Sequence, residues 1–157
     1  MQKWRLFTSV LICSVLAITT LAQPVQARGT AHKTSPYSPG VADSARSYYL
    51  SVWGIDNLLV RKTASGNLIR FSYRVVDPVR AAALGDNRAT PYLYGQRSRA
   101  VLQIPVMDKV GRLRQAGKPE AGKEYWMVFS NKGNPVKAGD RVNVVIGSFH
   151  ADGLITE

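Results

Sequence analysis

The chain is short of cysteine and histidine, and this scarcity excludes several kinds of chemistry. Its 157 residues include one cysteine and two histidines. Cys13 lies in an apolar N-terminal run that we expect to be cleaved off, so the mature chain offers no thiol for catalysis, disulfide exchange or metal binding. His32 and His150 alone are too few for a histidine-based metal site. We therefore expect no metal and no cofactor.

A recognisable catalytic motif is also lacking. Ser148, His150 and Asp152 alternate in the stretch SFHAD, so on a strand they would share one face. Alternate residues of a strand lie about 6 to 7 Å apart, which is too far for a direct proton relay. We predict no catalytic residue. The alternative is an enzyme of unrecognised type that uses polar groups on loops.

The stretch GKPEAGKE, residues 117–124, is similar to a nucleotide-binding loop but lacks its final hydroxyl. Gly117, Gly122 and Lys123 match the pattern G-x-x-x-x-G-K-[S/T]. Glu124 replaces the hydroxyl that would bind Mg²⁺, and its charge would repel phosphates. The following YWMVF is typical of a strand, whereas a phosphate-binding loop leads into a helix. The stretch therefore predicts a basic turn before a strand, and no nucleotide site.

The N-terminal segment has the pattern of a secretory signal peptide. Lys3 and Arg5 precede the apolar run 6–21, and Val25 and Ala27 occupy the −3 and −1 positions of a cleavage site. We predict a signal peptide over residues 1–27 and an exported protein, periplasmic or extracellular, without a transmembrane segment after cleavage. An uncleaved membrane anchor is the alternative.

Acidic residues are about half as frequent as basic ones, with ten Asp and Glu against 21 Lys and Arg. Loss of Lys3 and Arg5 with the signal peptide leaves 19 basic residues and a net charge of about +9. Envelope polymers and lipid headgroups are anionic neighbours of an exported protein. The charge therefore predicts an anionic envelope component as a partner, but no specific nucleic-acid site. The alternative is that the charge only keeps the protein soluble.

Residues 28–46 are rich in Ser, Thr, Pro, Gly and Ala, which predicts a flexible leader before a folded domain at 47–157. Seven segments have strand character: 47–60, 68–76, 91–94, 99–105, 124–130, 141–149 and 154–156. The segment 77–85 begins with Asp-Pro and ends with Gly, which predicts one short helix. This pattern predicts an all-β fold, an antiparallel immunoglobulin-like β-sandwich; a small β-barrel is the alternative.

The alternation of apolar residues predicts which side chains form the core. The segments 68–76 and 141–149 each present an apolar face. The segment 124–130 is apolar on both faces, which predicts a central strand. We predict six core side chains: Phe71, Tyr73, Trp126, Phe129, Val144 and Ile146.

Two groups of residues are candidate binding sites. The first is a set of cations for anion contact, in and beside the loop 108–123: Lys109, Arg112, Arg114, Lys118 and Lys123. No aromatic residue is interleaved among them, which argues against a base-stacking platform, and a solvated loop is the alternative. The second is a candidate ligand patch: Tyr92, Tyr94, Arg97 and Arg99.

Three stretches, FSYRVVDP (71–78), KVGRLRQ (109–115) and YWMVFSNKGNPVKAGDRVNVVIG (125–147), resemble a group of small exported bacterial β-sandwich proteins of unassigned function. The resemblance covers residues 48–155 and carries no catalytic motif. We predict a non-catalytic exported β-sandwich module that binds a protein partner or an envelope component. The alternative is a cationic binder of anionic envelope polymers or lipid headgroups.

Overall fold

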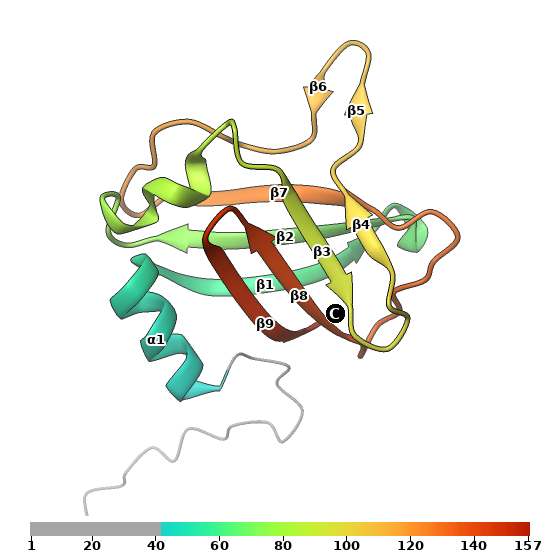
Figure 1. Ribbon diagram of the computed structural model, residues 1–157, viewed down its shortest axis with the longest axis horizontal. Coiled ribbons are helices and arrows are strands. Elements are labelled where there is room, and N and C mark those ends of the chain that lie inside the picture. The colour runs from blue at the N-terminus through green and yellow to red at the C-terminus, as the bar shows by residue number, and fades with distance from the viewer. Residues whose placement is uncertain (1–41) are drawn as a thin grey trace, which may run out of the picture. The chain divides into compact units, whose positions relative to one another are not determined.

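The computed structural model describes residues 42–157, which fold mainly into antiparallel strands (Figure 1). The predicted signal peptide and residues 28–41 of the predicted leader lie outside the described residues. In chain order the elements are α1 (Asp43–Trp53), β1 (Ile55–Thr63), the 3₁₀ helix η1 (Ala64–Gly66), β2 (Leu68–Val75), the 3₁₀ helix η2 (Arg80–Gly85), β3 (Pro91–Gly95), β4 (Val101–Gln103), β5 (Val106–Met107), β6 (Gly111–Arg112), β7 (Glu124–Ser130), β8 (Arg141–Ile146) and β9 (Phe149–Ile155).

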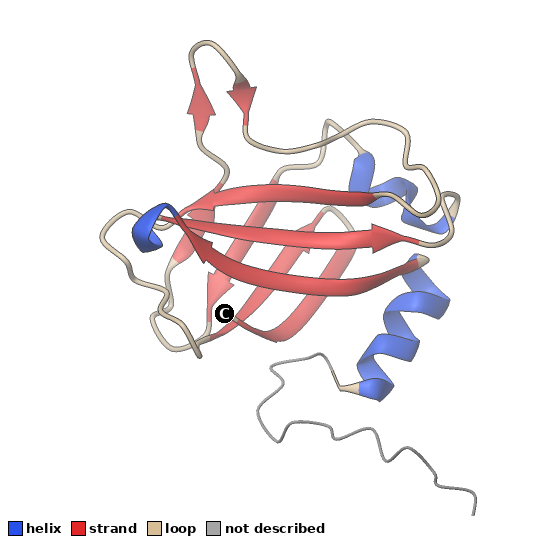
Figure 2. Ribbon diagram, turned by 180° about the vertical axis from the view of Figure 1, so that it is seen from behind, coloured by secondary structure: helices blue, strands red, loops and turns tan. Residues whose placement is uncertain are grey.

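Two larger sheets form layers that face each other across the core (Figures 1 and 2). One has the strand order β1-β2-β7 and the other β4-β3-β8-β9, while β5 and β6 form a separate hairpin. The strand pairs within all three sheets are antiparallel. An isolated parallel bridge between Val60 and Thr156 joins the two layers at one end. The prediction of an all-β antiparallel fold is confirmed. Within residues 42–157 the sheets do not close on each other, so the small-barrel alternative is wrong.

The core between the layers follows the predicted alternation of β2. Phe71 and Tyr73 point inward and are 0% and 2% exposed, whereas Arg70 and Arg74 lie exposed on the opposite face. The Phe71 ring lies 5.6 Å from that of Tyr73 and 6.5 Å from that of Phe149 in the other sheet. The predicted inward positions in β8, Val144 and Ile146, are also fully buried.

Trp126, by contrast, is not a core residue. It pairs with Ser72 in the register of β2 and β7, and the Arg70 guanidinium lies 5.3 Å from its ring on the outer face. The inner face of β7 carries Met127 and Phe129, both 0% exposed. Successive side chains of a strand point to opposite faces, so Trp126 lies on the outer face, where it is only partly buried. The core prediction is confirmed for Phe129 and wrong for Trp126.

The helix α1 occupies the first part of the segment that is predicted as a strand, residues 47–60. It begins at Asp43, before the predicted start of the folded domain. Tyr49 and Trp53 lie one helical turn apart, and their rings pack 6.3 and 5.2 Å from that of Phe149. The strand prediction fails because the aromatic residues suit a sheet by composition, while their spacing suits one face of a helix.

β7 lies at the edge of its sheet, so the prediction of a central strand is wrong. Its open side receives the segment 113–115 instead. The N–H of Val128 donates to the carbonyl oxygen of Leu113 at 2.9 Å, and the N–H of Gln115 donates to that of Trp126 at 2.9 Å. These bonds cover an edge that would otherwise be open to other strands.

The predicted strand 141–149 is two strands. β8 ends at Ile146 and β9 begins at Phe149, with Gly147 and Ser148 as the turn between them. The φ of Gly147 is +57°, which is the left-handed conformation that two-residue hairpin turns require. The strand predicted at the end of the chain belongs to β9.

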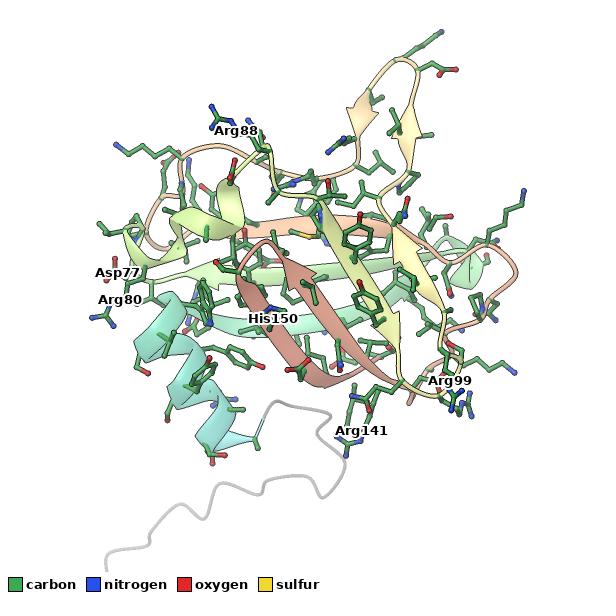
Figure 3. The ribbon with its side chains drawn as sticks, in the orientation of Figure 1. Asp77, Arg80, Arg88, Arg99, Arg141 and His150 are labelled. Atoms are coloured by element: carbon green, nitrogen blue, oxygen red, sulfur yellow. The ribbon has the colours of Figure 1, made fainter. Side chains whose placement is uncertain are left out.

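The short helix predicted over 77–85 is the 3₁₀ helix η2. The carboxylate of Asp77 accepts the N–H groups of Val79 and Arg80 at 2.9 and 3.3 Å, as expected for a residue that starts a helical turn. Arg80 pairs with Asp77 at 3.3 Å and donates to the carbonyl oxygen of Ser51 in α1. Figure 3 shows Asp77 and Arg80 together beside the end of this helix. The pair therefore links η2 to α1.

A buried amide, Asn131, holds two turns together. Its Nδ2 donates to the carbonyl oxygens of Gly66 and Val136 at 2.7 and 2.8 Å, and its Oδ1 accepts the N–H of Val136 at 3.0 Å. A buried polar group is stabilising only when its hydrogen bonds are made. Asn131 thereby anchors η1 against the loop that follows β7.

Candidate functional site

The outer face of the four-stranded sheet combines aromatic, apolar and polar side chains. We call it the tyrosine face and define it by residues that alternate outward along β3, β4, β8 and β9: Tyr92, Tyr94, Val101, Gln103, Asn143, Val145 and His150. The rings of Tyr92 and Tyr94 lie 6.3 Å apart and are tilted by 40°. Tyr94 and Val101 are opposite one another in the register and are 39% and 51% exposed.

The polar groups of this face are held in position by their neighbours. The Oδ1 of Asn143 accepts the N–H of Gly153 at 2.9 Å and the side-chain amide of Gln96 at 2.7 Å. His150 lies opposite Val145 and faces the viewer near the centre of Figure 3. Tilted aromatic rings beside oriented amides can bind a ligand that has both apolar and hydrogen-bonding parts.

The four residues of the predicted ligand patch do not form one patch in the structure. Tyr92 and Tyr94 are adjacent on β3. Arg97 is engaged elsewhere, because its guanidinium contacts the buried carboxylate of Asp140 at 2.8 Å. Arg99 lies in the turn after β3, in the left-handed conformation, at a corner of the molecule away from His150 (Figure 3). The two tyrosines thus belong to one face, whereas Arg97 forms an ion pair with Asp140 within the domain.

The five predicted anion-contacting cations are also divided. Arg114 is half-buried, and its guanidinium donates to the carbonyl oxygens of Ala89 and Asp86 at 2.7 and 3.0 Å. Burial of the guanidinium lowers the pKa of Arg114. Lys123 forms an ion pair with Glu120 at 2.7 Å. These two cations are therefore occupied within the protein.

The other three cations are exposed. Lys109 and Arg112 belong to the β5–β6 hairpin, and Lys118 lies in the loop that leads to β7. The loop runs directly into the strand β7, as the strand character of YWMVF predicts. The interpretation of GKPEAGKE as a turn before a strand is confirmed.

The hydrophobic side chains of the hairpin are absent from the predicted sites. Val106, Met107 and Val110 are 70%, 50% and 71% exposed. The sequence signal for these side chains is the apolar content of VMDKVG, residues 106–111, at the start of the basic loop. The two-residue strands β5 and β6 place this stretch on a projecting hairpin. Val106 and Met107 are successive residues of β5 and so point to opposite faces of the hairpin, and Val110 lies in its turn. Several exposed apolar side chains on one short hairpin are a common mark of an interaction surface.

Two of the hollows on the described residues lie away from the tyrosine face. One of about 300 Å³ lies between the start of α1, β1 and β9, and its wall includes Leu58, Arg141 and Asp152. Another of about 200 Å³ lies on the outer face of the three-stranded sheet, beside Arg70 and Glu124. In the second hollow, Arg70 and Glu124 form an ion pair at 3.6 Å.

Ser148 lies in the turn before β9, while His150 and Asp152 are exposed on the strand itself. The backbone N–H of Asp152 donates to the hydroxyl of Tyr49 at 3.3 Å. No set of three or more His, Cys, Asp or Glu side chains in residues 42–157 is placed to hold a metal ion.

In the part of the chain that the structure describes, none of the helices combines the length and the apolar character needed to cross a bilayer. Comparison with models of protein families, with curated proteins and with solved structures finds no match for this chain.

Proposed function

We propose that the protein is a non-catalytic, exported module that binds a protein partner or another envelope component through the tyrosine face. The observation that supports this most is the exposure of Tyr94 and Val101 side by side on a sheet face that carries oriented amides. Tyrosine is enriched at binding surfaces because it offers apolar area and a hydroxyl with little loss of side-chain entropy.

We further propose that the sandwich is immunoglobulin-like. Without the two short strands β5 and β6, the first, second and fifth strands form one sheet, and the order of the other is fourth, third, sixth and seventh. In immunoglobulin domains strands A, B and E share a sheet, C, F and G share the other, and variable domains add C′ beside C. The two orders agree for strands A, B, C, C′, E, F and G, while strand D of immunoglobulin domains has no counterpart in the three-stranded sheet. Such sandwiches are frequent in proteins that bind others at the cell surface.

The proposal can be tested by site-specific photo-crosslinking in the cell that exports the protein. A photoreactive phenylalanine derivative at Tyr94 should give a discrete crosslinked species, because a partner on the tyrosine face would contact the residue. The same derivative at Val79, which is 84% exposed and lies before η2, is the control and should give none.

Equal crosslinking at both positions, or none at Tyr94, would contradict the proposal. A Val101→Ser variant provides a second check, because it removes apolar area from the face without touching the core. It should weaken the Tyr94 adduct while the thermal stability stays within about 0.5 kcal/mol of wild type.

A further inference from the structure

The β5–β6 hairpin is a second surface of unusual composition, separate from the tyrosine face. It projects away from both sheets (Figure 1). Within five residues it exposes Val106, Met107 and Val110 to at least half of their area. Its turn is closed by a hydrogen bond from the N–H of Val110 to the carbonyl oxygen of Met107 at 3.2 Å. Three large apolar side chains are therefore held in water on a defined turn, which is unfavourable unless something covers them.

Unpaired positive charge accompanies these apolar side chains. Lys109 lies between Met107 and Val110 in sequence, and Arg112 follows in β6. The ion pairs within residues 42–157 involve neither cation. The hairpin holds one acidic residue, Asp108, so its own charge is positive.

Neighbouring loops extend this charge. The hydrogen bonds from Arg114 to the carbonyl oxygens of Ala89 and Asp86 hold the end of the hairpin beside the loop after η2. That loop carries Arg88, which points into solvent on the same upper edge of the molecule in Figure 3. A hollow of about 130 Å³ at the base of the hairpin has Arg112 in its wall. Asp108 and Lys109 thus form the apex of the turn, and further cations lie at the base of the hairpin and in the loop beside it.

The combination fits one kind of partner better than the others. A soluble polyanion would use the cations but leaves the three exposed apolar side chains of the hairpin unexplained. A peptide that adds a strand needs a longer edge than the two residues of β5 or β6. The surface of a bilayer rich in acidic phospholipid presents phosphates at one depth and acyl chains just below them, which matches exposed apolar side chains with cations on the same hairpin.

We propose that the β5–β6 hairpin docks on acidic phospholipid bilayers. Val106, Met107 and Val110 enter the boundary between headgroups and acyl chains, and Lys109 and Arg112 contact the lipid phosphates. This inference is independent of the tyrosine face, because it rests on different residues and a different ligand.

Sedimentation with vesicles tests this docking, using the protein purified in the form that its host produces. Vesicles of phosphatidylcholine with 40% phosphatidylglycerol serve as the probe, and pure phosphatidylcholine vesicles serve as the uncharged reference. The variant K109Q/R112Q should bind the acidic vesicles roughly 30-fold more weakly, because each cation near an acidic surface contributes about a fivefold factor. The variant V106S/M107S/V110S should bind roughly tenfold more weakly even though its charge is unchanged.

Two control variants show whether a loss of affinity comes from the hairpin residues or from any loss of net charge or of exposed apolar area. K132Q/K137Q removes the same charge from the loop after β7, and Val79→Ser alters an apolar residue of comparable exposure. Both should bind within twofold of wild type. The melting temperature of each variant shows whether it is folded. If V106S/M107S/V110S does not fold, Val110→Ser replaces it, and if K109Q/R112Q does not fold, Lys109→Gln replaces it.

Several outcomes would overturn the proposal. If K132Q/K137Q loses as much affinity as K109Q/R112Q, the attraction comes from net charge. If V106S/M107S/V110S binds like wild type, the apolar side chains make no contact and the ligand is a polyanion and not a bilayer. If none of the variants changes binding, another part of the chain makes the contact.

Discussion

Phe71 shows how much depends on a single side chain in this fold. It lies in the middle strand of one sheet, fully buried, and its ring approaches both Tyr73 of the same strand and Phe149 of the facing sheet. Its neighbour Arg70 is exposed and contacts Trp126 and Glu124 on the outer face. Residues one position apart in β2 therefore have opposite physical roles.

Phe71→Ala should lower the free energy of unfolding by about 3 to 5 kcal/mol, because it removes apolar contacts and leaves a cavity between the sheets. Arg70→Ala should lower it by less than about 1 kcal/mol, since its ion pair and its stacking on Trp126 are open to water. Urea denaturation of both variants measures the difference. Equal losses would mean that the register of β2 is wrong.

Tyr73 should make the protein sensitive to alkaline pH. Burial raises its pKa to about 12, whereas a phenol in the unfolded chain loses its proton near pH 10. Below pH 10 both states hold the proton and the shift has no effect. Between about pH 10 and 12 unfolding releases a proton, so the free energy of unfolding falls by up to about 1.4 kcal/mol per pH unit.

Tyr73→Phe should remove that part of the alkaline loss. The experiment compares the free energy of unfolding of wild type and variant from pH 8 to 11.5, with the exposed substitution Tyr94→Phe as control. A constant difference between wild type and Tyr73→Phe over the whole range would contradict the burial of the phenol.

At the scale of elements, α1 and β7 show that the amino-acid composition of a segment does not by itself determine its secondary structure or its place in a sheet. α1 is rich in residues that favour strands, yet Tyr49 and Trp53 face the core only because a helix brings them to the same side. β7 is apolar enough for a central strand, yet it pairs with β2 on one side and with the segment 113–115 on the other. The spacing of Tyr49 and Trp53 is a local signal for the helix, whereas the position of β7 depends on which distant segments lie beside it.

The helical assignment predicts unequal effects for two adjacent tyrosines. Tyr49→Ala should lower the free energy of unfolding by about 3 kcal/mol, because Tyr49 is 5% exposed and packs against Phe149. Tyr48→Ala should cost less than about 1 kcal/mol, since Tyr48 is 50% exposed. Thermal denaturation of both variants provides the comparison, and a larger loss for Tyr48→Ala would refute the buried face assigned to α1.

At the scale of the whole molecule, the positive charge is only partly neutralised by the fold. Residues 42–157 contain 17 basic and ten acidic residues, and their seven ion pairs each engage one of the basic residues. The remaining cations of this region lie in turns or near strand ends, including Lys109 and Arg112 on the hairpin and Lys132 and Lys137 in another loop. The excess charge is thus spread over separate loops, and the exposed side chains of Val106, Met107 and Val110 are what distinguish the hairpin.

The signal-peptide prediction concerns the whole chain and lies outside the described residues. If it is right, the exported protein begins at Arg28, because cleavage follows Ala27. Mass spectrometry of the protein recovered from the exporting host should show this N-terminus in the fraction outside the cytoplasmic membrane. An intact Met1 in the membrane fraction would support the anchor alternative instead.

The sequence by itself determined the antiparallel β class, the inward face of β2 and β8, and the turn nature of GKPEAGKE. These features depend on alternation and on turn residues, which act over a few neighbours. The pairing of Tyr92 and Tyr94 also follows from alternation along one strand. Only the tertiary structure decided that Arg97 and Arg114 would be used within the fold, because their partners, Asp140 and the carbonyls near η2, lie more than 20 residues away in the chain. Whether a side chain is free for a ligand depends on such long-range contacts, which a local pattern does not specify.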